Sequence, residues 1–262
     1  MARPANVDLC PSRTPSADRE GAFHEAHRRD DGREPRDRPR RRQAHPAPVA
    51  GRALLVVTRG SSGAQLAAEL ATGGRTVSHV SADLGSLDSV RSAATEIRDR
   101  LDRGDLPPLR GFVGNAGIQY TNALTETPDG FESTFTVNVL ANHLFVRLLQ
   151  DRFTAPARIV ITASDTHFGD FKHNMGMVPG PAWKSPDLLA RTGAFPEPDT
   201  VVAGRTAYST SKLAAIYLVH EYARRLPAGI DAVAYNPGFV PAPASPATPT
   251  PSPGSRCGAS CR

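Results

Sequence analysis

The sequence predicts an α/β fold, a doubly wound parallel sheet with helices on both faces. Between residues 51 and 240, short apolar runs of strand length alternate with longer amphipathic stretches of helix length. The flanking residues 1–50 and 241–262 hold 13 of the 24 prolines and few large apolar side chains, so burial there cannot offset the entropy of ordering. We therefore expect one domain at 51–240 between two disordered tails.

The first expected unit is a strand, a helix and a second strand. Residues 53–58 (ALLVVT) form an almost wholly apolar run, which is typical of a strand buried on both faces. A short helix over 62–71 is expected to stop at the glycine pair 73–74, because glycine favours helix ends. Residues 76–80 then supply the next strand.

The middle of the domain repeats this alternation. Ser86 is placed to cap a helix, since the apolar side chains between residues 87 and 101 recur at helical spacing. A strand is expected at 110–114, a long helix over 130–153 and a further strand over 158–162 (RIVIT).

The last third contains one long interruption. Residues 165–205 form an irregular segment with several prolines, followed by a helix over 206–226 and a final strand over 230–235. Because strands connected through helices run parallel, these elements predict a single parallel sheet.

The charge distribution argues against one class of partner. The formal net charge is +5, but residues 1–50 hold 11 Arg against 8 acidic residues, whereas residues 51–240 hold 18 basic and 18 acidic side chains. A nucleic-acid-binding domain carries its basic patch on the folded part, so no nucleic-acid partner is expected.

The cysteines and the apolar runs exclude two further classes. Cys10, Cys257 and Cys261 all lie in the tails, so neither a disulfide nor a cysteine-ligated metal is expected in the domain. The longest wholly apolar run, Ala53–Val57, is too short to span a bilayer, and the first thirty residues lack the apolar stretch of a secretory signal. We expect a cytoplasmic protein without a membrane span or a metal site.

The stretch Tyr208-Ser209-Thr210-Ser211-Lys212 carries the clearest chemical signal. Tyr208 and Lys212 are four residues apart, so on a helix their side chains share one face. A nearby ammonium favours the phenolate form of a tyrosine, which suits acid–base work on a carbonyl or an alcohol. Ser164 directly follows the strand expected to end near residue 162, at the edge of a parallel sheet where ligands bind.

Further polar motifs follow other strands in order. GNAG at 114–117 follows the strand over 110–114, Asn138 lies in a helix, and Pro237-Gly238 follows the last strand. Together with Ser164 and the Tyr-x-x-x-Lys pair, these motifs resemble the short-chain dehydrogenase/reductase family over about residues 53–240. The resemblance implies a Rossmann-like sheet and an NAD(P)-dependent oxidoreductase acting on a small-molecule carbonyl or alcohol. It is compatible with an oligomer.

The resemblance also implies roles for individual residues. Tyr208 would be the acid/base, Lys212 would orient the nicotinamide ribose, Ser164 would position the substrate oxygen, and Asn138 would support a proton relay. NADP is the expected cofactor, with NAD possible. The residues expected to contact it are Arg59, Asp83, Leu84, Asn115, Ala116, Gly117, Pro237 and Gly238.

The gap between Ser164 and Tyr208 spans 44 residues and resembles the retinol dehydrogenase and protochlorophyllide reductase branch, as do SLDSVR at 86–91 and PDGFESTFTVN at 128–138. The inserted segment is rich in Phe, Met and Trp. It is either a lid for a bulky, apolar substrate or a surface loop that packs on itself.

The phosphate-binding motif of the family departs from its pattern in this chain. In T-G-x-x-x-G-x-G the glycines let the backbone approach the pyrophosphate, but here Arg59 and Gln65 replace two of them. Only one strand–helix–strand unit fits between Thr58 and Asp83, where the family has two. The run over 53–58 therefore matches the family's second strand better, with Arg59 as a contact to the NADP 2′-phosphate and Gly60–Gly63 as a turn and helix cap.

This assignment leaves the chain without the family's first strand and helix, and without its last helix and strand. We expect the run over 53–58 to pair with 76–80 and, across the gap, with 110–114, because an unpaired central edge leaves backbone hydrogen bonds unmade. We also expect weak binding of NADPH. The alternative function is a cofactor-free remnant acting as a binding or interaction protein; a working phosphate loop distinguishes the two.

Overall fold

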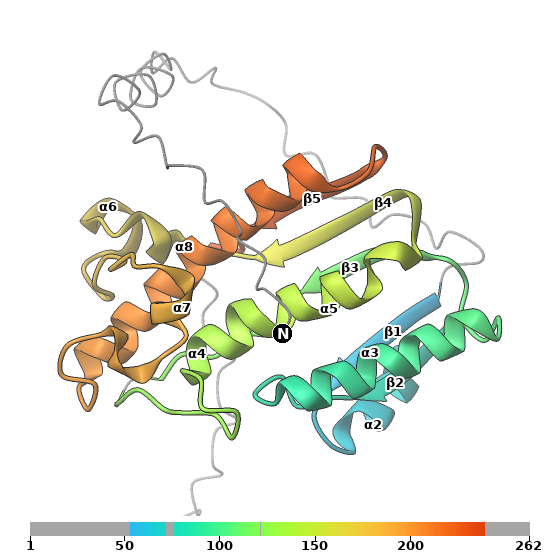
Figure 1. Cartoon of the computed structure of the whole chain (residues 1–262), viewed down its shortest axis with the longest axis horizontal. Helices are drawn as coiled ribbons and strands as arrows, with labels where there is room; N and C mark the ends of the chain where they lie inside the picture. The colour runs from blue at the N-terminus through green and yellow to red at the C-terminus, as the bar shows by residue number, and fades with distance from the viewer. Residues whose placement is uncertain (1–52, 72–75, 121, 239–262) are drawn as a thin grey trace, which may run out of the picture. The chain divides into compact units, whose positions relative to one another are not determined.

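The computed structural model describes residues 53–71, 76–120 and 122–238 (Figure 1). The two tails expected to be disordered, 1–50 and 241–262, lie outside the described residues, as does the glycine pair 73–74. The described part consists of parallel strands connected through helices, so the predicted α/β class is confirmed.

The strands form two parallel sheets instead of one. β1 (Ala53–Thr58) pairs with β2 (Thr76–Ser81) in the register Ala53↔Thr76 to Thr58↔Ser81. β3 (Leu109–Gly114), β4 (Phe153–Thr162) and β5 (Ile230–Tyr235) form the second sheet in that order. The expected neighbours β1 and β2 are confirmed, but the expected pairing of β1 with β3 is wrong, because no ladder joins them.

Helix packing explains why the break stays open. α3 (Leu87–Asp102) connects β2 to β3 and packs against α5 (Ala141–Leu149). Packed helices lie about 8–10 Å apart, roughly two strand spacings of about 4.8 Å. Two helices in contact therefore hold the strands beneath them about two positions apart. If the run over 53–58 matches the family's second strand, as the sequence predicts, the break falls where the family's order, 3-2-1-4-5-6, has its first strand.

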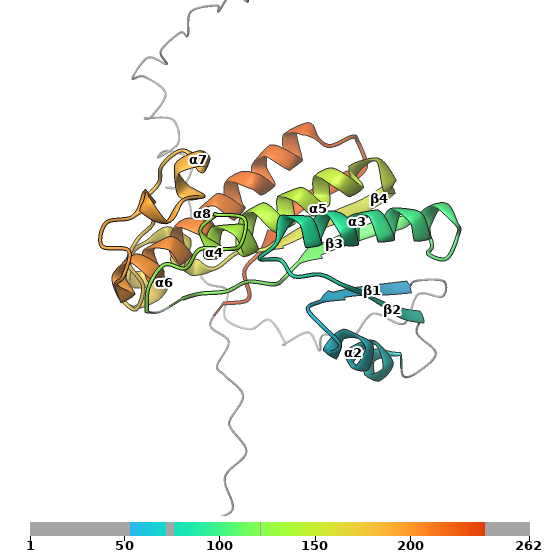
Figure 2. The ribbon, with the colours of Figure 1, turned by 60° about the horizontal axis from the view of Figure 1, so that its bottom comes forward.

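Figure 2 shows α3, α5 and α8 (Val201–Arg225) on one side of the strands and α2 (Ser62–Leu70) on the other side of β1 and β2. The main core lies under the three helices and joins both sheets; its fully or largely buried side chains include Val80, Val90, Ile97, Phe145, Ile159 and Val219. No helix among the described residues combines the length and the apolar character needed to cross a membrane.

The helix expected over 130–153 is interrupted. Its first turn, α4 (Ser133–Phe135), is capped by Glu132, whose carboxylate accepts hydrogen bonds from the Thr134 and Phe135 amides at 2.9 and 2.6 Å. A π-helical turn, η2 (Thr136–Leu140), separates it from α5, and a 3-10 turn, η3 (Gln150–Arg152), follows α5. Phe153 already belongs to β4, so the predicted helix end was also wrong.

The segment expected to be irregular over 165–205 contains short helical turns, which are η4 (Asp165–Phe168), α6 (Phe171–Asn174), α7 (Pro186–Leu189) and η5 (Thr192–Ala194). α8 starts at Val201 instead of 206, because the Thr200 hydroxyl accepts a hydrogen bond from the Ala203 amide at 3.2 Å and caps the helix. The final strand has the predicted bounds.

Candidate active site

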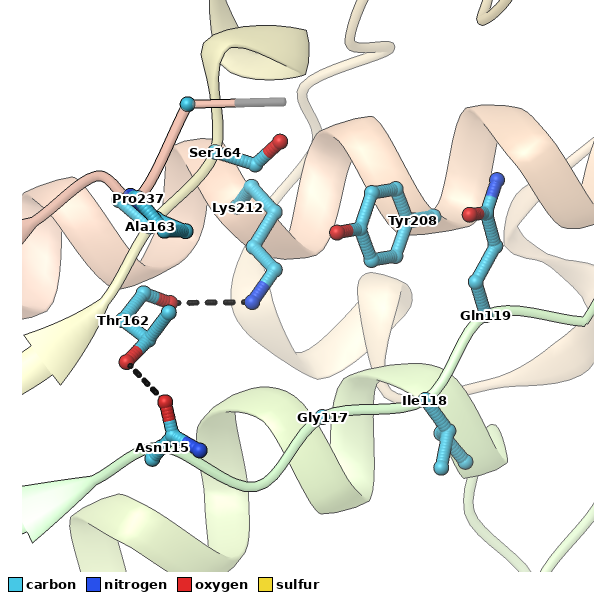
Figure 3. A pocket seen from close by; sticks show the side chains of 11 residues that line it. Asn115, Gly117, Ile118, Gln119, Thr162, Ala163, Ser164, Tyr208, Lys212 and Pro237 are labelled. Carbon is cyan, nitrogen blue, oxygen red and sulfur yellow. Dashed lines mark hydrogen bonds between the residues drawn. The ribbon is translucent and has the colours of Figure 1, made fainter. Parts of the chain in front are cut away.

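Polar side chains gather at the carboxyl ends of β3, β4 and β5 (Figure 3). They line a pocket of about 340 Å³, a size that suits part of a small ligand. Its lining residues are Asn115, Gly117, Ile118, Gln119, Thr162, Ala163, Ser164, Tyr208, Lys212, Pro237 and Gly238. The sequence prediction missed Ile118, Gln119, Thr162 and Ala163, which follow or precede predicted site residues along the same strand ends.

Tyr208 and Lys212 project from one face of α8 into this pocket (Figure 3). The Lys212 ammonium lies 5.5 Å from the centroid of the Tyr208 ring and donates a hydrogen bond to the Thr162 carbonyl at 3.0 Å. Only 5% of Lys212 is exposed, and burial lowers the pKa of its ammonium to about 8. The pocket therefore contains a buried positive charge next to the Tyr208 ring.

The buried ammonium predicts a pH-dependent stability. The pKa of Lys212 falls from 10.5 to about 8 on folding, so between these values the unfolded chain binds more protons and stability rises with pH. Below pH 8 the full cost of burying the charge, about 3 kcal/mol, is present. We expect Lys212→Met to raise the free energy of unfolding by about 2 kcal/mol at neutral pH, because the lost hydrogen bond offsets about 1 kcal/mol.

Denaturant unfolding of both proteins across the alkaline range measures this difference, which should shrink as pH approaches 10.5. Lys172→Met, at an exposed lysine of α6, is the matched control and should change stability by less than about 0.5 kcal/mol. A difference between wild type and Lys212→Met that stays constant with pH would contradict the prediction.

Ser164 and Asn138 occupy different positions relative to the pocket. Ser164 follows β4, lines the pocket and caps η4, with its hydroxyl accepting from the Thr166 amide at 3.4 Å. Asn138 lies behind the lining, 3% exposed, and its amide group binds both backbone groups of Ile118, at 2.8 and 3.0 Å, and the Ser211 hydroxyl at 2.9 Å. Asn138 therefore fixes the loop after β3.

The predicted cofactor residues are only partly brought together. Asn115, Gly117, Pro237 and Gly238 line the pocket, and Asn115 is held by a 3.1 Å hydrogen bond from the Thr162 hydroxyl. The exposed Ala116 lies between two of these lining residues. The pocket lining does not include Arg59, Asp83 or Leu84. The Asp83 carboxylate accepts from the Gly85 amide at 2.9 Å, and Leu84 packs against the core.

Comparison with known proteins places this arrangement in a family. A family model described as short chain dehydrogenase matches residues 47–175, which include β1 to β4 and Ser164. The chain belongs to the short-chain dehydrogenase/reductase family.

Two curated relatives and one solved structure show the extent of the similarity. The short-chain dehydrogenase iccH of Talaromyces variabilis is 30% identical over 190 residues, covering 61% of this chain and 52% of that protein. Retinol dehydrogenase 13 of Homo sapiens is 32% identical over 171 residues, covering 62% of this chain and 44% of that protein. This chain thus spans about half the length of the curated relatives it matches.

The solved structure shares the fold. The crystal structure of a blue fluorescent protein from a metagenomic library in complex with NADPH has a TM-score of 0.50 and 24% sequence identity, and the match covers 70% of this chain and 62% of that one. Nothing in these comparisons favours the alternative of a cofactor-free binding protein over a short-chain dehydrogenase/reductase.

The two glycines of the turn after β1 have different local roles. Gly60 has a φ of +70°, as the predicted turn requires. A Cβ on Gly63 would lie 2.0 Å from the His79 ring and 2.2 Å from the Thr58 hydroxyl, so this glycine lets α2 pack against β1 and β2. Ser61 is the N-cap residue but makes no side-chain capping bond, because its backbone is helical instead of extended.

Gly114 and Asn142 form a close contact that sequence reasoning missed. A Cβ on Gly114 would lie 2.5 Å from Asn142 Oδ1 and 2.9 Å from Ile161 Cδ1. The Asn142 amide group also donates a 3.0 Å hydrogen bond to the carbonyl of Asn138, within the π-helical turn. The sequence signal that could have indicated this contact is Gly114, which stands where family members carry the first Asn of N-N-A-G. In the structure, Asn142 occupies the space next to Gly114.

This contact predicts a matched pair of substitutions in β3. We expect Gly114→Ala to lower the free energy of unfolding by about 1–3 kcal/mol, because the new methyl group overlaps Asn142 and Ile161. Gly111→Ala, in the same strand but with its nearest contact at 3.7 Å, should cost less than about 0.5 kcal/mol.

Thermal and denaturant unfolding of the two variants test the prediction. Combining Gly114→Ala with Asn142→Ala should recover at least about 0.5 kcal/mol relative to additive effects. Equal losses for the two glycine variants would show that Asn142 does not set the space at Gly114.

Proposed function

We propose that this chain is an NAD(P)-dependent dehydrogenase/reductase whose pocket binds the carbonyl or alcohol of the substrate. The observation that carries the proposal is the convergence of Tyr208, Lys212 and Ser164 in one pocket at the carboxyl ends of the strands. Residue types able to hold a proton, a positive charge and a substrate oxygen lie within one small volume, which is what reduction of a carbonyl requires.

The pocket fits one end of a nicotinamide dinucleotide. The Lys212 ammonium has three N–H donors, of which one binds the Thr162 carbonyl. The other donors are available to the hydroxyls of a ribose. Gly117 keeps the loop side open, since a Cβ there would lie 3.2 Å from Asn138 Oδ1 and 3.4 Å from Lys212 Nζ. The adenosine and phosphate end lacks such a set of donors in the pocket lining.

Tyr208, Ser164 and Lys212 would each have a different role in the proton transfer. A nicotinamide dinucleotide, when bound, supplies or accepts the hydride. The Tyr208 hydroxyl has no hydrogen-bond partner among the described residues, so it is free to give a proton to a carbonyl oxygen or take one from an alcohol. Ser164 would hold that oxygen, and the Lys212 ammonium would stabilise the phenolate that remains. Asn138 is a positioning residue, because its side chain is fully engaged with Ile118 and Ser211.

NADP is the preferred cofactor in this proposal. Arg59 directly follows β1 and is exposed, where it can meet a 2′-phosphate as the family resemblance implies. The crystal structure with the same fold holds NADPH, which agrees with a nicotinamide dinucleotide.

The proposed substrate is a bulky, apolar carbonyl compound. Phe168 and Phe171 follow shortly after Ser164 and are 53% and 76% exposed. The Phe168 ring stacks on His173, with ring centroids 4.1 Å apart, and is tilted against His167, with centroids 4.0 Å apart. Met175 and Met177 add exposed apolar surface to the same segment. An exposed apolar segment that follows the pocket residue Ser164 in the chain suits a substrate with one carbonyl and a large apolar body.

A substrate series tests the function. Aldehydes and ketones of increasing apolar size are offered to the full chain with NADPH at millimolar concentration, and consumption of NADPH is followed by absorbance. We expect reduction that becomes more efficient as the apolar part grows. Absence of reduction with every carbonyl, at an NADPH concentration at which calorimetry shows the cofactor bound, would refute the proposal.

A further inference from the structure

A side-chain hydrogen bond joins the two loops that follow β4 and β5. The backbone hydrogen bonds between these strands reach the Ala163 amide and the Tyr235 carbonyl, which lie 2.8 Å apart. One residue beyond Tyr235, the side-chain amide of Asn236 donates a hydrogen bond to the Asp165 carboxylate. Within residues 163–170 and 235–238, all of which the structure describes, no other side-chain hydrogen bond connects the two loops.

Asp165 is linked to the pocket through Ser164, the residue before it. Asp165 starts η4, and the Ser164 hydroxyl caps this turn by accepting from the Thr166 amide at 3.4 Å. His167 Nδ1 donates to the Ser164 carbonyl at 2.5 Å, since a carbonyl oxygen can only accept. These bonds hold the turn together internally, but they do not fix its position relative to the loop after β5.

Asn236 is linked to the pocket through the next two residues, Pro237 and Gly238. Its side-chain oxygen accepts a hydrogen bond from the Gly238 amide at 3.1 Å, and Gly238 has a φ of +69°. One side chain therefore holds the turn with its oxygen and Asp165 with its amide group. Because Ser164, Pro237 and Gly238 all line the pocket, the bond between Asp165 and Asn236 connects two parts of the pocket wall.

We propose that Asp165 and Asn236 are positioning residues, whose hydrogen bond fixes Ser164 relative to the Pro237-Gly238 turn. This inference rests on the proposed function, in which Ser164 holds the substrate oxygen, and on the expected contact of the turn with the cofactor. Hydride transfer requires the carbonyl and the cofactor at a set separation, and a displacement of about 1 Å can cost about 100-fold in rate. The bond itself is exposed, so it contributes more to this separation than to stability.

Two substitutions of Asp165 test the hydrogen bond. Asp165→Ala removes the acceptor and should lower kcat for carbonyl reduction by about tenfold or more, with NADPH bound and the denaturant midpoint nearly unchanged. Asp165→Asn keeps an oxygen that can accept from Asn236, so it should retain at least about a third of the rate. A kcat of Asp165→Ala equal to that of the wild type would overturn the proposal.

The partner substitution adds a dependence on pH that a loss of packing would not produce. In Asn236→Asp two carboxylates face each other; they repel when both are ionised, and protonation of one restores a hydrogen bond. The kcat of Asn236→Asp relative to wild type should therefore rise at least about threefold between about pH 8 and about pH 5. His167 and Lys212, the nearby titratable groups, are present in both proteins, so their effects cancel in the ratio.

The swapped double variant completes the set. Asp165→Asn combined with Asn236→Asp restores one donor and one acceptor, so it should recover the rate and lose the added pH dependence. Asn122→Asp places the same charge at an exposed residue outside the pocket lining and should keep the wild-type profile. A ratio that stays flat with pH, or a swap no faster than Asn236→Asp alone, would contradict the positioning role.

Amide hydrogen exchange separates this inference from the proposed function. The His167 amide, which donates to the Ser164 carbonyl at 3.1 Å, and the Gly238 amide report on the two loops. Asp165→Ala should speed exchange at both amides by at least about threefold, and Asn122→Asp at neither. Faster exchange in Asp165→Ala together with a wild type that reduces no carbonyl would refute the proposed function and leave the link between the loops supported. Unchanged exchange at both amides would overturn the link itself.

Discussion

We expect NADPH to bind this chain with a dissociation constant in the millimolar range or weaker. Members of the family hold the pyrophosphate with backbone N–H groups of a glycine-rich turn at a helix N-terminus. Here Gly63 serves packing, since it makes room for His79 and Thr58, and Gly60 serves a turn with a positive φ. Hydrogen bonds to phosphate contribute about 1.5–3 kcal/mol each, so losing two or three costs roughly 3–9 kcal/mol and turns a micromolar ligand into a millimolar one.

Titration calorimetry or cofactor fluorescence with the full chain measures this constant. Arg59→Ala is the informative variant, because an exposed arginine recovers little of the loss and its removal should weaken binding less than about fivefold. A dissociation constant at or below the micromolar range would contradict the prediction. It would indicate that Gly60–Gly63 binds the pyrophosphate of the cofactor.

Tyr208→Phe should reduce turnover by at least about 100-fold at saturating NADPH, while leaving cofactor affinity nearly unchanged. The substitution removes one hydroxyl, the proton donor that the proposed function assigns, and general acid catalysis is worth about 10²–10⁴ in rate. The ring itself remains against Lys212, so the pocket keeps its shape.

A second tyrosine of α8 is the matched control. Tyr217 is 45% exposed and packs edge-on against Trp183, and it does not line the pocket. Tyr217→Phe should therefore keep at least about half of the rate. Substantial residual turnover in Tyr208→Phe would show that another group donates the proton.

The sequence predicted the elements whose patterns are local. The strand over 230–235 has the predicted bounds, and Ser86 caps α3 as expected, with its hydroxyl accepting from the Ser89 amide at 3.3 Å. The π-helical turn at Thr136–Leu140 could not be predicted, because one extra residue in a turn barely alters the spacing of apolar side chains. The missing ladder between β1 and β3 depends on the packing of α3 against α5, which no local pattern records.

The sequence predicted most residues of the candidate site, but it did not predict where all of them lie relative to the pocket. Tyr208, Lys212 and Ser164 line one pocket, because strand ends and one helix face determine their positions. Asn138 was placed among them, but it lies behind the lining and binds Ile118. Its position depends on the π-helical turn and on Asn142, a residue that only the three-dimensional contact with Gly114 singles out.

The break in the sheet has a consequence for how the chain unfolds. No ladder of hydrogen bonds crosses from β1 to β3, so the β1–α2–β2 unit is joined to the β3–β4–β5 sheet mainly through the apolar face of α3, which buries Val90, Ala93, Ala94 and Ile97. Cooperativity between two parts of a domain is carried by the contacts they share. We therefore expect the unit around β1 and β2 to open at a lower free energy than the sheet around β4, with α3 coupling the two, which amide hydrogen exchange measures.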